Sequence, residues 1–457
     1  MNYRERIADK MLREKLDAMG AVLIEGPKAC GKTTTAEQQA KCVIYIDDPT
    51  KQAQYKLMAQ TNIGALLDGA TPRLLDEWQM LPQLWDAIRF TVDHREGDGQ
   101  FILTGSAVPA DTSEIHHSGA GRYGWLLMRP MSLWESGDST GEVSLGKLFT
   151  SPEAIGASSH VDIARLAYLI CRGGWPRAIA KQTEKSTLQQ VVEYYRAIVG
   201  SDISRVDNVR RDSERAMRIM RSYARHQGAQ VSVATISKDI SANEVDAVSE
   251  STIKAYLTAL RKIFVIEDMR AWNPNLRSKT SIRTSDTRYY VDPSIAVAAL
   301  GLGPEDLTND LETMELLFET LCMRDLRVYA DAIDGNVYHY RDKSGLECDA
   351  VVHLRNGQYG LIEIKLGGDS LIEDGVKTLT ALSSLIDTTR MKAPAFKMVL
   401  TGVGDYAYCR WGRRLRRPHR HPPQLIRFVS RSESQFKVGK NSFERYSGAR
   451  ERKKMSK

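Results

Sequence analysis

Gly26-Pro27-Lys28-Ala29-Cys30-Gly31-Lys32-Thr33 is the stretch that decides the fold of the N-terminal part of the chain. It fits the phosphate-loop pattern G-x-x-x-x-G-K-[ST], in which backbone N–H groups surround phosphates, the lysine neutralises them and the final hydroxyl binds Mg²⁺. An apolar run, Ala21 to Ile24, precedes the loop, and the residues from Thr33 to Lys41 contain no Gly or Pro. A strand before the loop and a helix after it, with the helix N-terminus facing the phosphates, are therefore expected. We predict that Gly26 to Thr34 binds a nucleoside triphosphate, taken as ATP, together with Mg²⁺.

Two later segments add strands and acids to this predicted nucleotide site. The run 43–48 is apolar, has the length of a strand and ends in two aspartates, and we expect it beside the first strand. The segment 73–78 has the form of a short strand that ends in Asp76 and Glu77. There Asp76 would hold Mg²⁺ together with Thr33, and Glu77 would polarise the attacking water. Acids at strand ends are commonly only solvated, but their order after a phosphate loop favours a parallel-sheet ATPase.

The region after the next predicted strand, 101–106, makes the pattern more specific. Gly121-Arg122-Tyr123 is followed by a segment from Leu126 to Glu135, and Arg172-Gly173-Gly174-Trp175-Pro176 follows an apolar helix over 163–171. Together these motifs resemble a prokaryotic AAA+-type ATPase family whose members carry a C-terminal domain of uncharacterised function. The resemblance covers residues 1–408 and implies an α/β protein with a parallel-sheet ATPase domain.

The resemblance also implies further catalytic residues. In AAA+-type ATPases a polar residue at the end of the strand at 101–106 senses the γ-phosphate, and Thr104 or Ser106 occupies that place. Arg122 is a candidate arginine finger or sensor, since a cation near the γ-phosphate stabilises the charge that develops in transfer. A surface arginine that pairs with an acid is the alternative for Arg122. The predicted catalytic set is therefore Lys32, Glu77, Thr104 and Arg122.

Length and composition set the class of protein. The chain has 457 residues, 42% hydrophobic and 26% charged, which indicates a soluble globular protein of several domains. No apolar run approaches the ~18 residues that span a bilayer, and the charged start carries no signal-peptide core. The six cysteines are scattered without a C-x-x-C pair, so neither a zinc site nor a disulfide framework is indicated. We expect a reduced, cytoplasmic protein with no membrane partner.

The predicted organisation has five parts. They are an ATPase domain over 1–140, a helical lid or linker over 141–225, a winged-helix-like domain over 226–300, a restriction-endonuclease-like domain over 301–408 and a basic tail over 409–457.

A winged-helix layout is predicted from two short helices and a strand. The helices are expected over 231–240 and 248–260, the second with a serine cap at Ser249 or Ser251, and the strand over 263–268. Thr252, Lys254 and Thr258 would lie on the exposed face of a recognition helix. Because this helix is not strongly basic, DNA contact and contact with an unknown protein partner both remain open.

A third group of residues lies after residue 311. A helix carries Glu319, one strand carries Asp349, and another carries Glu363 and Lys365, whose side chains point to one face because strand side chains alternate. This order resembles the D…(D/E)-x-K pattern of restriction-endonuclease-like folds. The resemblance implies that Asp349 and Glu363 share a second divalent metal, that Lys365 positions water and that Glu319 adds a further acid. The alternative is a simple ion pair on a strand face, and the fold by itself does not imply nuclease activity.

The tail from Cys409 differs in composition from everything before it. It holds 16 Lys+Arg and 3 Asp+Glu, a balance of +13, whereas the remainder has 64−16 = 48 basic and 57−3 = 54 acidic residues, a balance of −6. A one-base shift in a permitted back-translation of 412–422 gives Asp-Gly-Val-Tyr-Val-Val-Pro-Ile-Gly-Thr, a turn and strand of the kind that ends the family. We interpret the tail as a frameshift product that is disordered and leaves the domain without its last strand. A basic nucleic-acid-binding arm and a solvated disordered tail are the alternatives.

Three functions follow from these motifs. The first is an ATPase whose nucleotide state drives rearrangement of the C-terminal half. The second is a slow nucleotide-gated switch or interaction protein. The third is a metal-dependent DNA nuclease that the ATPase licenses.

Overall fold

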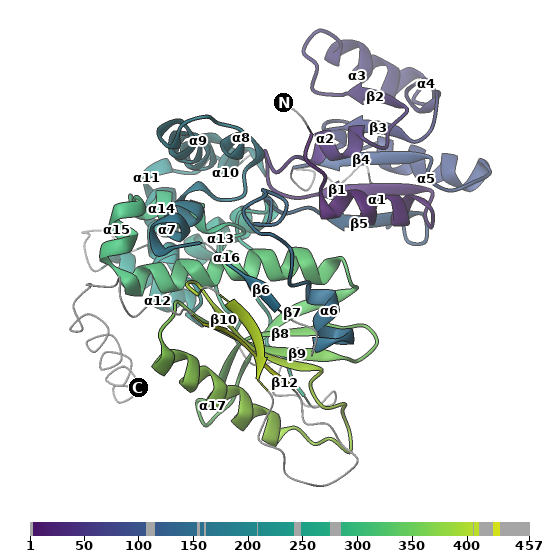
Figure 1. The fold of residues 1–457 in the computed structure, drawn as a ribbon. Helices are drawn as coiled ribbons and strands as arrows, with labels where there is room; N and C mark the ends of the chain where they lie inside the picture. Colours follow the sequence, from purple (N-terminus) through teal and green to yellow (C-terminus); the bar gives the residue numbers. More distant parts are fainter. Residues whose placement is uncertain are drawn as a thin grey trace.

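The structure is a computed structural model that describes residues 3–106, 115–152, 156–159, 161–207, 209–241, 248–274 and 285–404, and the backbone of 406–410 and 424–429. Within these residues the strands form two sheets, one of five strands and one of seven. Figure 1 shows the N-terminal sheet and the C-terminal sheet well apart, with helices of the middle region beside both.

The N-terminal sheet is parallel and carries the phosphate loop at its carboxyl edge. Its strands are β1 (Ala21–Glu25), β2 (Cys42–Tyr45), β3 (Arg73–Asp76), β4 (Phe101–Gly105) and β5 (Tyr123–Leu127), in the order β2-β3-β4-β1-β5. The expectation that 43–48 lies beside the first strand is wrong. Strand β1 pairs with β4 and β5, so β2 is left to pair with β3 at the edge. The helices of this domain are α1 (Ile7–Leu16), α2 (Lys32–Glu37), α3 (Gln52–Thr61), α4 (Gly64–Leu67) and α5 (Leu84–His94).

The middle region is mainly helical. It contains α6 (Leu145–Thr150), α7 (Ile163–Arg172), α8 (Pro176–Ile179), α9 (Glu184–Ala197), a π-helical turn η3 (Ile198–Asp202), α10 (Ile203–Arg205) and α11 (Ser213–Ala224). Helices α12 (Val233–Ser241), α13 (Glu250–Lys262), α14 (Pro293–Leu300) and α15 (Pro304–Asn309) follow. A short strand, β6 (Gly156–Ser158), leaves this region to pair with the C-terminal sheet. We call the helices α7 to α11, with η3, the helical module.

Of the three expected winged-helix elements, the two helices are present as α12 and α13, but the strand is not. Helix α13 begins after Ser249, whose hydroxyl accepts from the backbone N–H of Thr252, so the predicted serine cap is present. In place of the predicted strand over 263–268 the chain forms isolated bridges, Ile266 with Tyr290 and Met269 with Thr287. Phe264 adopts a positive φ of 58°, which interrupts the extended run and explains why no longer strand forms.

The C-terminal sheet is mixed and lies between two long helices. Its order is β6-β11-β12-β10-β9-β8-β7, with β7 (Gly335–Arg341), β8 (Glu347–Leu354), β9 (Tyr359–Lys365), β10 (Phe396–Thr401), β11 (Tyr406–Arg410) and β12 (Gln424–Val429). Helix α16 (Leu311–Asp331) contacts β7, β8 and β9. Helix α17 (Asp369–Leu385) contacts β8, β9 and β10. In Figure 1, α17 lies on the side of the sheet away from α16.

The basic tail is not wholly irregular. The prediction that everything from Cys409 is disordered, and that the last strand is missing, is wrong for residues 409–410 and 424–429. These residues belong to β11 and to β12, and β12 pairs in parallel with β10. The run Gln-Leu-Ile-Arg-Phe-Val is rich in strand-forming residues, and the overall charge of the tail concealed it. The other residues after 410 lie outside the described part of the chain.

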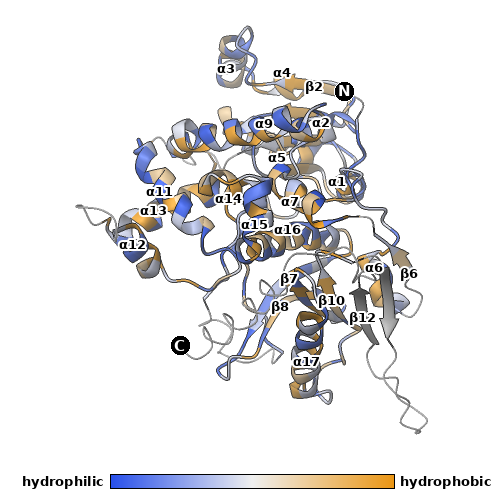
Figure 2. Cartoon of the chain, turned by 60° about the vertical axis from the view of Figure 1, so that its left-hand side comes forward, coloured by the Kyte–Doolittle hydropathy of each residue, from blue (hydrophilic) through white to orange (hydrophobic). Residues whose placement is uncertain are grey.

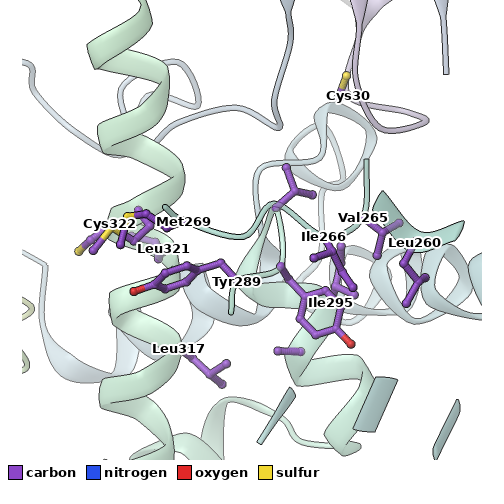
Figure 3. Close-up of a cluster of buried hydrophobic side chains, with 14 of the residues drawn as sticks. Cys30, Leu260, Val265, Ile266, Met269, Tyr289, Ile295, Leu317, Leu321 and Cys322 are labelled. Atoms are coloured by element: carbon purple, nitrogen blue, oxygen red, sulfur yellow. The ribbon is translucent and has the colours of Figure 1, made fainter. Parts of the chain in front are cut away.

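Each sheet uses its two faces differently. On β1, Val22 and Ile24 point into a large core shared with the helical module and with α16, whereas Ala21 and Leu23 point into a separate core under α5. On β9, Ile362 and Ile364 belong to the same large core, and the opposite face of the strand packs on α17. Figure 3 shows part of the shared core, in which labelled side chains from distant segments, among them Leu260, Tyr289 and Leu317, lie near one another. In Figure 2 helices such as α13 and α17 carry both hydrophobic and hydrophilic residues, as this packing requires.

Candidate functional site

The phosphate loop has the backbone that its glycines permit. Gly26, Ala29 and Gly31 have positive φ angles of 146°, 61° and 103°. A Cβ at Gly26 would lie 2.0 Å from the carbonyl oxygen of Met128, so no other residue fits there without displacing the backbone. The loop therefore connects β1 to α2 with positive φ angles at three of its residues, a backbone form in which successive N–H groups can bind a phosphate.

Lys32, Thr33 and Thr34 form the first turn of α2, directly after the loop. Lys32 is 6% exposed, and its Nζ donates to the carbonyl oxygens of Gly26 and Pro27 at 2.9 and 2.8 Å. The ammonium group is thus folded back onto its own loop and must turn to meet a phosphate. The predicted helix over 33–41 is shorter than expected, since α2 ends at Glu37. Thr34 is exposed on it.

Asp76 is the centre of a small polar group at the end of β3. Its carboxylate accepts from the hydroxyl of Thr33 at 2.8 Å and from the hydroxyl of Thr104 on the neighbouring strand β4. Burial raises the pKa of Asp76, against these two hydrogen bonds, which lower it. A hydroxyl and a carboxylate in contact are oxygen ligands suited to Mg²⁺, so this pair fits the metal that accompanies a nucleotide. The sequence-predicted residues Thr33, Asp76 and Thr104 are therefore together in space.

Glu77 lies next to this group in an unusual backbone conformation. Its φ is 56°, which turns the side chain out of the direction of β3. Its Oε2 atom accepts from Gln79 Nε2 and from the hydroxyl of Ser106 at 3.3 Å. Each of the two sensor candidates thus contacts a predicted acid: Thr104 contacts Asp76, and Ser106 contacts Glu77. The sequence pattern did not indicate that Gln79 donates a hydrogen bond to Glu77.

Arg122 lies away from the phosphate loop. It precedes β5, and β5 runs parallel to β1 with Tyr123 opposite Ala21, so Arg122 is at the amino edge of the sheet. The phosphate loop leaves from the carboxyl edge, about 17 Å away for a five-residue strand. Here Arg122 Nε pairs with Asp93 at 2.8 Å, the surface ion pair that was the alternative for this residue. Arg122 therefore does not join the nucleotide site of its own chain.

Arg6 is a contributor that the sequence did not reveal. Arg6 is 5% exposed, and its guanidinium donates to the carbonyl oxygen of Cys30 at 2.8 Å, to that of Arg129 at 2.9 Å and to Glu135 Oε1 at 2.9 Å. Arg6 therefore links Cys30 of the phosphate loop to Arg129 in the segment after β5. Glu135 also accepts from the backbone N–H of Ser132, which gives a structural role to the final acid of the family-like segment. An arginine in a charged N-terminal run carries no signal for such a contact.

Three regions of the chain match known protein families. Residues 19–136 match the family described as "AAA domain", residues 163–306 match a domain of unknown function (DUF8612), and residues 315–405 match another domain of unknown function (DUF4143). Residues 19–136 therefore resemble an AAA-type P-loop domain. The match covers the phosphate loop, the Asp76 group and the segment to Glu135.

Several proteins of known sequence or structure are distantly similar to this chain. Uncharacterized proteins of Mycobacterium bovis and Mycobacterium tuberculosis are each 22% identical over 371 residues, which is 80% of this chain and 74% of theirs. A Walker-type ATPase of Pyrococcus abyssi aligns over 64% of this chain and 94% of that chain, with 15% identity and a TM-score of 0.39. The ORC2 protein of Aeropyrum pernix aligns over 69% and 93%, with 13% identity and a TM-score of 0.29. Both likenesses are too low to carry an argument about function.

A second charged group lies in the C-terminal sheet. Lys365 Nζ is 2.8 Å from Glu363 Oε2 and 3.3 Å from Asp349 Oδ2, and the side chains of Lys365 and Glu363 are each 5% exposed. Asp349 Oδ2 also accepts from the backbone N–H of Ile364 at 2.7 Å. The structure thus brings together Asp349, Glu363 and Lys365 from neighbouring strands.

Glu319 approaches the same group from α16. Its carboxyl accepts from the hydroxyl of Tyr289, and its pKa is raised to about 8, first by burial and then by the negative charge of Asp349. In the described residues, however, no three acidic, histidine or cysteine side chains are arranged to hold a metal ion. The cation between Asp349 and Glu363 is the ammonium of Lys365, so a second divalent metal would have to displace this ammonium to reach both carboxylates.

The predicted recognition face on α13 is modest in charge. Lys254 and Thr258 are exposed, whereas Thr252 is half-buried at the capped start of the helix. The carboxylate of Glu250, one turn earlier, lies 3.9 Å from Nζ of Lys254 and offsets its charge.

Among the described helices, none has the length and apolar character of a membrane span.

Proposed function

We propose that this protein binds Mg²⁺–ATP at the phosphate loop and hydrolyses it. The arrangement that supports this best is the contact of both Thr33 and Thr104 with Asp76 at the carboxyl edge of the sheet, beside the loop. In this proposal Lys32 turns from the loop carbonyls to the terminal phosphates, and Thr33 and Asp76 hold the metal. Glu77 orients the attacking water, and Thr104 reports the γ-phosphate through Asp76.

The test is steady-state release of phosphate from ATP by the full chain, with Mg²⁺ present and with Mg²⁺ removed by a chelator. Hydrolysis should require the metal and should fall to background in Lys32→Ala. As a matched control, Lys41→Ala changes an exposed lysine just after α2 and should leave the rate unchanged. Wild-type turnover without Mg²⁺, or full turnover in Lys32→Ala, would refute the proposed site.

We further propose that the nucleotide state is transmitted to the C-terminal half. Arg129, which follows β5, is buried and pairs with Glu267 at 2.6 Å and with Asp331 at the end of α16. Although burial opposes it, the guanidinium groups of Arg129 and Arg327 hold the pKa of Glu267 down to about 2. Since Arg6 contacts both Cys30 and the carbonyl of Arg129, a change at the loop has a short route to these ion pairs.

A motor and a slow switch differ in turnover. If the C-terminal half is driven through repeated cycles, DNA or a protein partner should raise the rate of hydrolysis. If the chain is a nucleotide-gated switch, turnover should stay slow with every ligand while affinity for the partner differs between the ADP and ATP states. Measuring both quantities on the same preparation, with duplex DNA as the first ligand, separates the two.

A second candidate function is cleavage of DNA at the C-terminal group. The observation that favours it is the buried contact of Lys365 with both Asp349 and Glu363, because the sequence pattern predicts these residues as one site. A divalent metal would have to displace the ammonium of Lys365 to reach the two carboxylates. Nicking of supercoiled plasmid in Mg²⁺ or Mn²⁺, lost in Asp349→Ala but kept in the exposed control Glu347→Gln, would support it. Intact plasmid under all these conditions would reduce the group to a structural ion pair.

A further inference from the structure

The phosphate loop has an ion pair with the helical module that the proposed reaction does not use. Lys28, the third residue of the loop, places its Nζ 2.6 Å from Asp202 Oδ1. The two residues are 174 positions apart in the chain. Asp202 is 8% exposed and ends the π-helical turn η3, whereas the side chain of Lys28 is 44% exposed. Short π-helical turns within helical segments occur often at functional sites.

The contact is part of a wider approach of the helical module to the loop. A Cβ at Gly31 would lie 3.5 Å from the ring of Pro176, the first residue of α8. Trp175, just before it, packs on Tyr194 of α9 with ring centroids 4.2 Å apart. The helical module therefore approaches the phosphate loop at two points, through Asp202 at Lys28 and through Pro176 at Gly31.

With ATP bound at the loop, Lys28 would have two negative partners, the phosphates and Asp202. Bound ATP brings several negative charges into the loop, within reach of the flexible side chain of Lys28. Asp202 is a largely buried anion nearby, where charges interact more strongly than in water. Lys28 cannot neutralise both fully, so the phosphates and Asp202 must compete for it.

We propose that Asp202 is a positioning residue that holds Lys28 for the helical module and thereby weakens nucleotide binding until the module moves. This inference rests on the proposed ATP site and adds a regulation to it. By thermodynamic reciprocity, ATP weakens the contact between loop and module by the same factor as the contact weakens ATP binding. A partner that pulls the module off the loop then tightens ATP, and ATP loosens the module for a partner.

The test is the dissociation constant of a non-hydrolysable ATP analogue, adenylyl imidodiphosphate with Mg²⁺, measured by calorimetry on four versions of the full chain. Affinity should follow the local net charge. Asp202→Asn should bind at least about fivefold tighter than wild type, and Lys28→Met at least about fivefold weaker, the lower end of usual coupling. The double variant should return to within about twofold of wild type, and the differences should shrink in high salt.

Two further variants separate this role from a structural one. Asp202→Glu keeps the charge and should behave as wild type. Glu193→Gln removes an exposed ion pair with Arg196 on α9 and should change nothing. Hydrogen exchange over 184–205 should rise when the analogue binds to wild type and stay unchanged in Asp202→Asn.

The outcomes are distinguishable from failure of the ATP site itself. If the wild-type chain binds no analogue, the proposed function is wrong. If wild type binds but Asp202→Asn binds equally or more weakly, or the double variant is as weak as Lys28→Met, the ATP site stands and this inference is overturned.

Discussion

Replacing Arg324 by methionine should destabilise the junction between the ATPase domain and the C-terminal half. The Arg324 side chain is 1% exposed, and its guanidinium pairs with Asp292 at 2.9 Å and with Asp325 at 2.7 Å. Breaking a buried ion pair from one side costs about 3–5 kcal/mol, because the remaining charge stays buried without compensation. Here two carboxylates lose their cation at once.

The surroundings place the expected cost at the lower end of that range. Asp292 keeps a hydrogen bond from the backbone N–H of Gly174 at 2.9 Å, and Asp325 keeps one from that of Leu133 at 2.9 Å. Such bonds to a charged acceptor are each worth roughly 1.5 kcal/mol or more and continue to satisfy part of both groups. We therefore expect a loss of about 3 kcal/mol. At about 2.1 cal/mol/K of unfolding entropy per residue, this corresponds to a fall of about 3 °C in the melting temperature of the 457-residue chain.

Differential scanning calorimetry of the full chain measures this fall. The matched control is Arg341→Met, which removes an ion pair with Glu347 whose side chains are 35% and 52% exposed. Such a surface pair is worth at most about 1 kcal/mol. If Arg324→Met lowers the melting temperature no more than Arg341→Met does, the buried network does not stabilise the junction and the reasoning fails.

Three other predictions concern the two charged sites. Lys32→Ala should weaken ATP binding by about 100-fold in a calorimetric titration, since the fixed cation that supplies charge-assisted bonds to the phosphates is lost. Glu77→Gln should bind ATP normally but hydrolyse it about 10²–10⁴-fold more slowly in a single-turnover assay, and a wild-type rate would exclude Glu77 as the group that activates water. Glu319→Gln should remove a pH dependence of stability. Because the pKa of Glu319 is raised to about 8, its contribution is present below its ordinary pKa and lost as the pH rises towards 8. The melting temperature should therefore fall more from pH 5 to pH 8.5 in wild type than in Glu319→Gln; equal falls would contradict the raised pKa.

The parts of the fold that were predictable are those with local signals. The phosphate loop needs positive φ at fixed positions, so its glycines identify it, and the apolar runs of β1, β3 and β4 have the length of buried strands. The alternation along β9 correctly predicted that Glu363 and Lys365 share a face, and they are in contact. Ser249 was recognisable as a cap because capping is a property of neighbouring residues.

The parts that were not predictable depend on residues far apart in the chain. The place of β2 at the sheet edge is decided by which strands pair with β1, and no residue within β2 encodes it. Arg6 and Asp202 reach the phosphate loop only through tertiary packing. The strand β12 was missed because a charge balance averages over a long segment and conceals a six-residue run, rich in strand-forming residues, inside it.

The pairing of β6 with β11 has a consequence for how the protein is made. Ser158 pairs with Tyr406, so β6 leaves the ribosome 406−158 = 248 residues before its partner. At about 5–20 residues per second, synthesis of that interval takes roughly 12–50 s. Throughout this time β6 is an unpaired edge, the kind of segment that recruits other chains. Its sequence, Gly156-Ala157-Ser158, offers only three small side chains to such a partner. The strand that must wait longest during translation is thus among those least able to misassemble.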